Sequence, residues 1–102
     1  MTSPKLEKIC TLLKETEAKV KCSDLRSHLE QLGFTVRDGK RAGHKVVTHP
    51  SLKDFYSTSY NCGHGGNSVI KPAYIRNILK SLKIHEQALI EYLQRVGENG
   101  SP

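Results

Sequence analysis

The amino-acid sequence predicts an α/β protein of the α+β type: a three-stranded antiparallel sheet with helices packed on one face. Three observations support this fold class. Apolar residues recur at helical spacing up to Gly33, they alternate with polar residues in the segment that follows, and the helical spacing returns after Pro72. A chain of 102 residues suits one such domain. We predict a single domain over residues 1–97, with its core at about 23–84 and a flexible tail at 98–102.

Two helices are expected before the sheet. Ser3 can cap a helix that has Pro4 at its first position and runs to about residue 17, because its apolar residues recur at helical spacing. A second helix begins near Ser23 and ends before Gly33, a residue that suits a left-handed C-terminal cap. Both helices are amphipathic, so each has one face for the core.

The segment after Gly33 predicts a meander of three strands. Phe34 and Val36 alternate with polar residues, which indicates the first strand. Asp38-Gly39 predicts a tight hairpin turn, in which both central residues need positive φ. The second strand is expected at about 42–49 and the third at about 55–60.

A glycine-rich loop at 62–67 leads to two further helices, one from Pro72 and one at about 85–96. Helices packed on one face of an antiparallel sheet leave the other face in water. We therefore expect functional side chains on that open face. The glycine-rich loop lacks the pattern of a nucleotide-binding loop, so it is first of all a connection between strand and helix.

Charge is distributed unevenly along the chain. Residues 34–83 hold nine basic and two acidic side chains, a local excess of +7, whereas the whole chain carries +6. A segment of this kind favours a polyanionic partner, and nucleic acid is the most common one. No apolar run approaches the roughly 20 residues that span a bilayer, and no signal peptide is visible. These features predict a cytoplasmic protein in which Cys10, Cys22 and Cys62 are all reduced.

The histidines are the first candidates for chemistry. In the predicted second strand, alternation places His44 with Val46 and Thr48 on one face and His49 on the other. A zinc site is the alternative, since His44, His49, Cys62 and His64 are all potential donors. Their spacing matches the usual zinc patterns only in part. We therefore predict no metal and no cofactor.

Two segments of the chain resemble motifs of a known family. The first is Gly43-His44, then four further residues, then His49-Pro50, and the second is residues 70–80. They resemble the Gly-Ser-His and His-Pro segments and the final helix of the HicA toxins. The similarity in the order of elements covers about residues 23–84. Ala42-Gly43 stands where the family has Gly-Ser, and the helices at both ends are additions to the minimal domain.

The resemblance implies a double-stranded-RNA-binding-like fold and a metal-independent mRNA interferase of a type II toxin–antitoxin system. It makes His44 the catalytic residue, and it implies two partners: messenger RNA and a HicB-like antitoxin protein. His64 is the candidate general acid, on its loop position only. The expected RNA-binding residues are the basic side chains Arg37, Lys40, Arg41, Lys45, Lys71 and Arg76.

Two other function classes stay open. A fold of this kind can hold structured RNA through shape and phosphate contacts without cleaving it. A protein-interaction domain that keeps the fold and lacks the activity is the third possibility. Incubation of the chain with RNA in the presence of a chelator separates the enzyme from both of these binders.

Overall fold

The computed structural model describes residues 3–63 and 65–97, so the predicted tail at 98–102 lies outside the described residues. The four helices are α1 Pro4–Glu15, α2 Cys22–Gln31, α3 Pro72–Ile84 and α4 Glu86–Val96. The three strands are β1 Thr35–Asp38, β2 His44–Thr48 and β3 Thr58–Asn61. They form one antiparallel sheet in the order β1-β2-β3. The α+β fold class predicted from the sequence is thereby confirmed.

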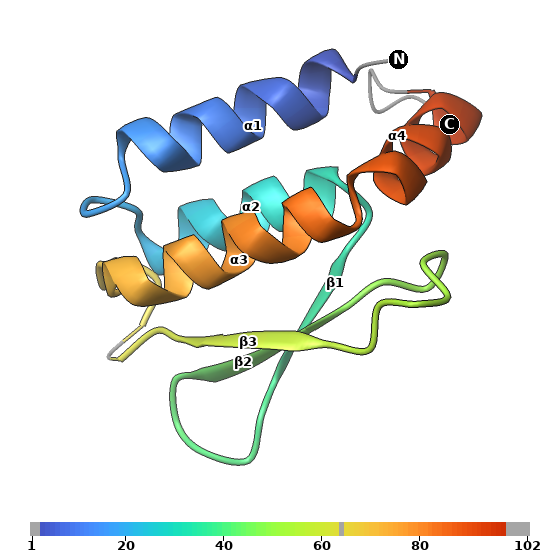
Figure 1. Cartoon of the computed structure of the whole chain (residues 1–102). Helices are drawn as coiled ribbons and strands as arrows, with labels where there is room; N and C mark the ends of the chain where they lie inside the picture. The colour runs from blue at the N-terminus through green and yellow to red at the C-terminus, as the bar shows by residue number, and fades with distance from the viewer. Residues whose placement is uncertain (1–2, 64, 98–102) are drawn as a thin grey trace.

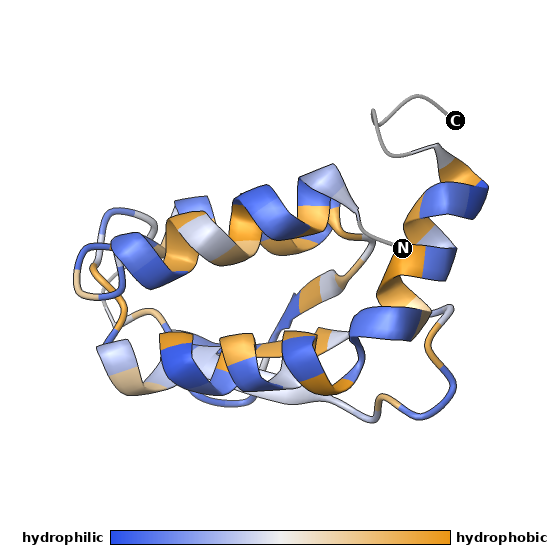
Figure 2. Ribbon diagram, turned by 45° about the horizontal axis from the view of Figure 1, so that its top comes forward, coloured by the Kyte–Doolittle hydropathy of each residue, from blue (hydrophilic) through white to orange (hydrophobic). Residues whose placement is uncertain are grey.

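The helices all lie on one side of the sheet (Figure 1). Helices α2 and α3 cover the sheet, α1 lies over them on the side away from the strands, and α4 follows α3 at one end of the molecule. Orange and blue segments alternate along the helices in Figure 2, as expected of amphipathic helices with one buried face. The radius of gyration is 13.0 Å, which fits a compact domain of this length. None of the described helices is long and apolar enough to cross a membrane.

Both helix caps predicted from the sequence are confirmed. The Ser3 hydroxyl accepts a hydrogen bond of 3.2 Å from the Leu6 N–H, at the start of α1. Gly33, just after α2, has a φ of +90°, and a β-carbon there would lie 2.5 Å from the Tyr92 ring of α4. Glycine is therefore needed at this position both for the backbone conformation and for the packing of α4.

The predicted tight turn at Asp38-Gly39 is wrong. Asp38 is the last residue of β1, β2 begins only at His44, and neither Asp38 nor Gly39 has positive φ. The connection is instead the five-residue loop 39–43, in which Gly43 has a φ of +80°. Pairing of Asp38 with Lys45 in the ladder extends β1 through the residue that the local pattern assigned to the turn.

The expectation of three reduced cysteines is also wrong in this structure. Cys22 and Cys62 form a disulfide between α2 and the residue that follows β3, with their Cα atoms 5.4 Å apart. The two residues are 40 positions apart in the sequence, and neither has a nearby cysteine that would suggest a pair. Cys10 is free and half-buried.

Candidate active site

The face of the sheet turned away from the helices carries the predicted catalytic histidine. His44 of β2 lies opposite Asn61 of β3, and Val46 lies between Arg37 of β1 and Ser59 of β3. Directly paired residues point to the same side of a sheet, so these side chains share one face. The other face supplies the buried side chains Val36, Val47 and Tyr60. The sheet therefore presents His44 on the side that the described helices leave uncovered (Figure 1).

Two glycines lie close to His44, one against its ring and one directly before it in the chain. A β-carbon at Gly39 would lie 2.2 Å from Cδ2 of the His44 ring, so the ring occupies the space that a side chain would need. The Gly39 N–H also donates to the His44 carbonyl at 2.8 Å. A β-carbon at Gly43 would lie 2.8 Å from the Gly63 carbonyl oxygen. The half-buried His44 ring forms no hydrogen bond with the residues the structure describes, so neither ring nitrogen is committed to a partner there.

Three cations lie on the same hairpin as His44. Arg37 belongs to β1 and shares the open face, while Lys40 and Arg41 lie in the 39–43 loop; all three are exposed. None of them forms an ion pair within the described part of the chain. Three positive charges without ion-pair partners, on the same hairpin as an imidazole, are suited to attracting a phosphate group to that hairpin.

Lys45 lies on the opposite side of the sheet from His44. Its side chain is only 20% exposed and forms an ion pair with Asp38, its partner in the ladder. The hydrogen bond from Lys45 holds the pKa of the Asp38 carboxyl below its ordinary value. Although Lys45 is adjacent to His44 in the sequence, strand alternation directs it toward α2.

The other two expected RNA-binding residues lie outside the hairpin. Lys71, just before α3, lines a cavity of about 450 Å³ together with Asn61 and Gly63, at the end of β3 opposite His44. Arg76 of α3 forms an ion pair with Glu17 beyond α1, on the helical side of the molecule. The structure thus groups Arg37, Lys40 and Arg41 with His44, and places Arg76 elsewhere.

His49 is a core residue on the helix side of the sheet. Strand alternation predicts that it lies on the side opposite to His44, as it does. Its side chain is 5% exposed, and its ring packs edge-on against Phe34 and Tyr92 at centroid distances of 4.7 Å. Its Nδ1 accepts a hydrogen bond from the Ser51 N–H, so Nε2 carries the proton that is donated to the Leu32 carbonyl at 3.0 Å. Burial lowers the pKa of His49, and the bond to Leu32 offsets this in part.

His64, the candidate general acid, lies outside the described residues. Asn61 is a site residue that sequence reasoning missed: it faces His44 across the ladder, and its Oδ1 accepts a hydrogen bond of 2.8 Å from the Gly63 N–H. In the sequence, its only distinguishing feature is its position directly before the Cys62-Gly63 loop. The strand register is needed to show that it faces His44.

The residues considered for zinc are not brought together where the structure describes them. His44 lies on the open face of the sheet, His49 is buried on the helix side just after β2, and the Cys62 sulfur is part of a disulfide. No group of three His, Cys, Asp or Glu side chains within residues 3–63 and 65–97 is arranged to hold a metal ion.

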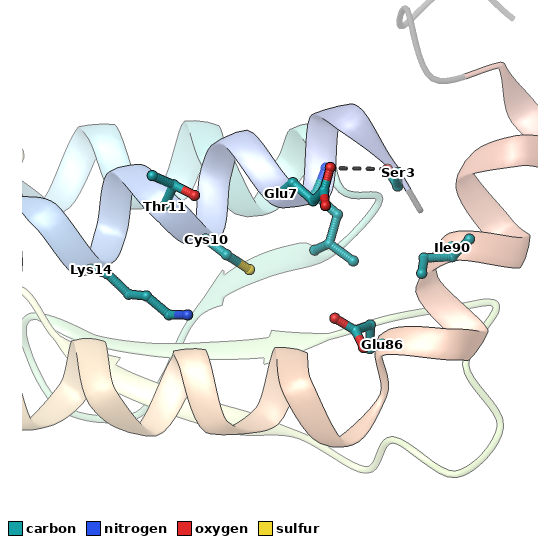
Figure 3. A pocket seen from close by; sticks show the side chains of 8 residues that line it. Ser3, Glu7, Cys10, Thr11, Lys14, Glu86 and Ile90 are labelled. Carbon is teal, nitrogen blue, oxygen red and sulfur yellow. Dashed lines mark hydrogen bonds between the residues drawn. The ribbon is translucent and has the colours of Figure 1, made fainter. Parts of the chain in front are cut away.

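A separate cavity of about 530 Å³ lies between α1 and α4 (Figure 3). Cys10, Lys14, Glu86 and Ile90 are among the residues that line it. Burial raises the pKa of the Cys10 thiol, although Lys14 lowers it in part. Burial therefore favours the protonated form of the Cys10 thiol, which is a poor nucleophile.

Comparison of the chain with protein-family models, curated proteins and solved structures found no match. The chemistry of the open face must therefore be inferred from its own residues.

Proposed function

We propose that this chain is a metal-independent endoribonuclease of the HicA type, in which His44 is the general base. The observation that supports this most is the grouping of His44 with Arg37, Lys40 and Arg41 on and beside the uncovered sheet face. The order helix, three strands, helix from α2 to α3 agrees with the order that the resemblance implies. Assignment to the double-stranded-RNA-binding-like fold is part of the same proposal.

The proposed reaction requires few catalytic groups. Neutral His44 takes the proton from a ribose 2′-hydroxyl, whose oxygen attacks the adjacent phosphorus. The bond from phosphorus to the 5′-oxygen breaks, which leaves a 2′,3′-cyclic phosphate on one product and, after protonation, a 5′-hydroxyl on the other. In this proposal Arg41 and Arg37, on the same hairpin as His44, stabilise the charge that develops on the phosphoryl oxygens.

An RNA-binding module without catalysis is the second candidate. The same face would hold RNA through its cations, and the lack of any hydrogen bond from a described residue to the His44 ring favours this reading. General bases are usually oriented by a further group. Substrate can supply that contact, so the two candidates must be separated by experiment.

The decisive experiment incubates the purified chain with a labelled RNA oligonucleotide in a chelating buffer. We expect cleavage that leaves 2′,3′-cyclic phosphate ends. A matched oligonucleotide with a single 2′-deoxy substitution at the cleaved position should bind equally well and stay intact. Binding of both oligonucleotides without any cleavage would favour the non-catalytic module, and absence of binding would exclude both candidates.

A cytoplasmic endoribonuclease of this kind needs a restraining partner. We propose a HicB-like antitoxin with a carboxylate-bearing surface that docks on the open face and covers His44. Complementarity to Arg37, Lys40 and Arg41 would steer the association. A complex that leaves His44 accessible to RNA, with unchanged cleavage, would contradict this.

A further inference from the structure

The Cys22–Cys62 disulfide lies at the end of the sheet where His44 begins β2. Cys22 is the first residue of α2, and Cys62 directly follows β3. The Cys62 N–H donates to the Gly43 carbonyl at 2.7 Å, and Gly43 immediately precedes His44. One backbone hydrogen bond therefore connects the disulfide-bonded residue to the strand end that presents the imidazole.

The glycine-rich connection after Cys62 is held against α2 by the same group of contacts. The Ser23 N–H donates to the Gly66 carbonyl at 3.0 Å, and the Cys22 N–H donates to the Ser68 carbonyl at 2.9 Å. Gly63 approaches Gly43 so closely that a β-carbon at Gly43 would clash with it. Among the described residues, the disulfide is thus the single covalent cross-link between α2 and the end of β3, next to the start of β2.

A cavity of about 300 Å³ adjoins this disulfide, whose cysteines are otherwise buried, with exposed fractions of 5% for Cys22 and 2% for Cys62. Both cysteines line it, together with Gly63, Gly65 and Gly66, which have no side chains to block an approach. Two cations, Arg26 of α2 and Lys45 of β2, line it as well, and each forms an ion pair, Arg26 with Glu30 and Lys45 with Asp38. The volume of the cavity matches the lower end of small-molecule sites. Because neither carboxylate is among its described lining residues, the lining itself carries positive charge, which favours an anionic thiol.

We propose that this disulfide is a reversible exchange site for a small anionic thiol, and that its reduction loosens the backbone that positions His44. The consequence for catalysis rests on the proposed function; the exchange chemistry does not. An incoming thiolate attacks the Cys62 sulfur and forms a mixed disulfide, while Cys22 leaves as thiolate at the N-terminus of α2, where negative charge is favoured. A second thiolate then attacks the mixed disulfide, which releases the Cys62 thiolate and the oxidised small disulfide.

The exchange step is tested by counting alkylated cysteines. Protein oxidised in air should expose one thiol, Cys10, after denaturation, and protein treated with glutathione should expose all three. Glutathione should reduce the Cys22–Cys62 disulfide faster than the cationic thiol cysteamine does at equal thiolate concentration. Arg26→Gln should slow glutathione by about threefold, the size expected of one partly screened charge, whereas the distant control Arg95→Gln should not. Three alkylated thiols in the oxidised sample, or equal rates for both thiols, would overturn the exchange site.

The structural consequence is read by amide hydrogen exchange on the intact chain, so it does not depend on a cysteine variant that fails to fold. Reduction should speed exchange of the Cys62 and Ser23 amides by at least tenfold, while the Leu29 amide inside α2 should change much less. Unchanged exchange at Cys62 would refute the loosening. RNA cleavage, measured in the same samples, should fall on reduction. Loosened amides with undiminished cleavage would refute the regulatory role, and loosened amides with no cleavage in either state would refute only the proposed function.

Discussion

His44 lies directly opposite Asn61 in the β2–β3 ladder, and Asn61 in turn accepts a hydrogen bond of 2.8 Å from the Gly63 N–H. This side chain therefore connects the strand pair that presents the imidazole with the start of the glycine-rich loop. The geometry at His44 depends on contacts from β3 and from the 39–43 loop as well as on β2 itself. Substitutions that displace the His44 ring and substitutions that remove it should therefore differ in their effect on the cleavage rate.

Replacement of His44 by alanine should abolish cleavage while the fold and most of the RNA affinity remain. The ring forms no hydrogen bond with described residues, and the affinity comes from Lys and Arg side chains. We expect the rate to fall by roughly 10² to 10⁴, the usual contribution of a positioned acid–base group, with a melting temperature close to that of the wild type. Single-turnover cleavage and thermal melting check this, and full activity in His44→Ala would exclude the mechanism.

The control is His49→Ala, just after β2 on the helix side of the sheet. It removes a buried ring, leaves the Leu32 carbonyl and the Ser51 N–H without their partner, and creates a cavity beside Phe34. These losses should cost about 2–4 kcal/mol of unfolding free energy. Cleavage per folded molecule should change far less than in His44→Ala.

Stability should depend on pH through His49. Its pKa in the folded state lies below the ordinary value of 6.5, because burial disfavours the charged ring. The unfolded chain therefore binds more protons in the range just below pH 6.5, and stability rises with pH there. The stability that depends on a neutral His49 is fully present above about pH 6.5. It is lost as the pH falls through 6.5 toward the folded-state pKa of His49. Melting curves between pH 7.5 and 5 should show a smaller decline for His49→Gln than for the wild type; parallel declines would contradict the assignment.

Gly39→Ala should impair cleavage through the position of the His44 ring. Its new β-carbon would fall 2.2 Å from His44 Cδ2, so the ring must move away. A displacement of about 1 Å in a reacting group can lower a rate by about 10²-fold. The matched control is Gly66→Ala, whose β-carbon would meet the Ser23 side chain, with Cβ at 3.6 Å and Oγ at 4.0 Å, both ordinary contacts. Equal activity in the two variants would show that the ring is not held by Gly39.

RNA binding should weaken steeply with salt, and the slope should separate Arg41 from Lys45. Each phosphate contact on single-stranded RNA contributes roughly 0.7 to the log–log slope. Arg41→Ala should lower the slope by about that amount because Arg41 is exposed beside His44. Lys45→Ala should leave the slope unchanged, since Lys45 faces α2 and pairs with Asp38. Binding titrations between about 50 and 200 mM salt measure the slope for both variants. If Arg41→Ala and Lys45→Ala lower the slope equally, RNA also contacts the helix-covered face of the sheet.

Much of the fold could be predicted because its signals are local. The Ser3 cap, the Gly33 cap and the change of apolar spacing after Gly33 each involve a few neighbouring residues, and the structure confirms them. The Asp38-Gly39 turn failed for the opposite reason. A dipeptide preference of modest energy was overridden by pairing of Asp38 with Lys45 in the neighbouring strand.

The sequence by itself determined that His44 and His49 lie on opposite faces of a strand, because alternation is a property of extended backbone. Only the tertiary structure decided which face is open, since that depends on where α2 and α3 pack. It also paired Cys22 with Cys62 and placed Asn61 opposite His44, across long sequence separations. Such contacts form when the helices and strands close on a common core, and no local pattern in the chain specifies which distant residues will then meet.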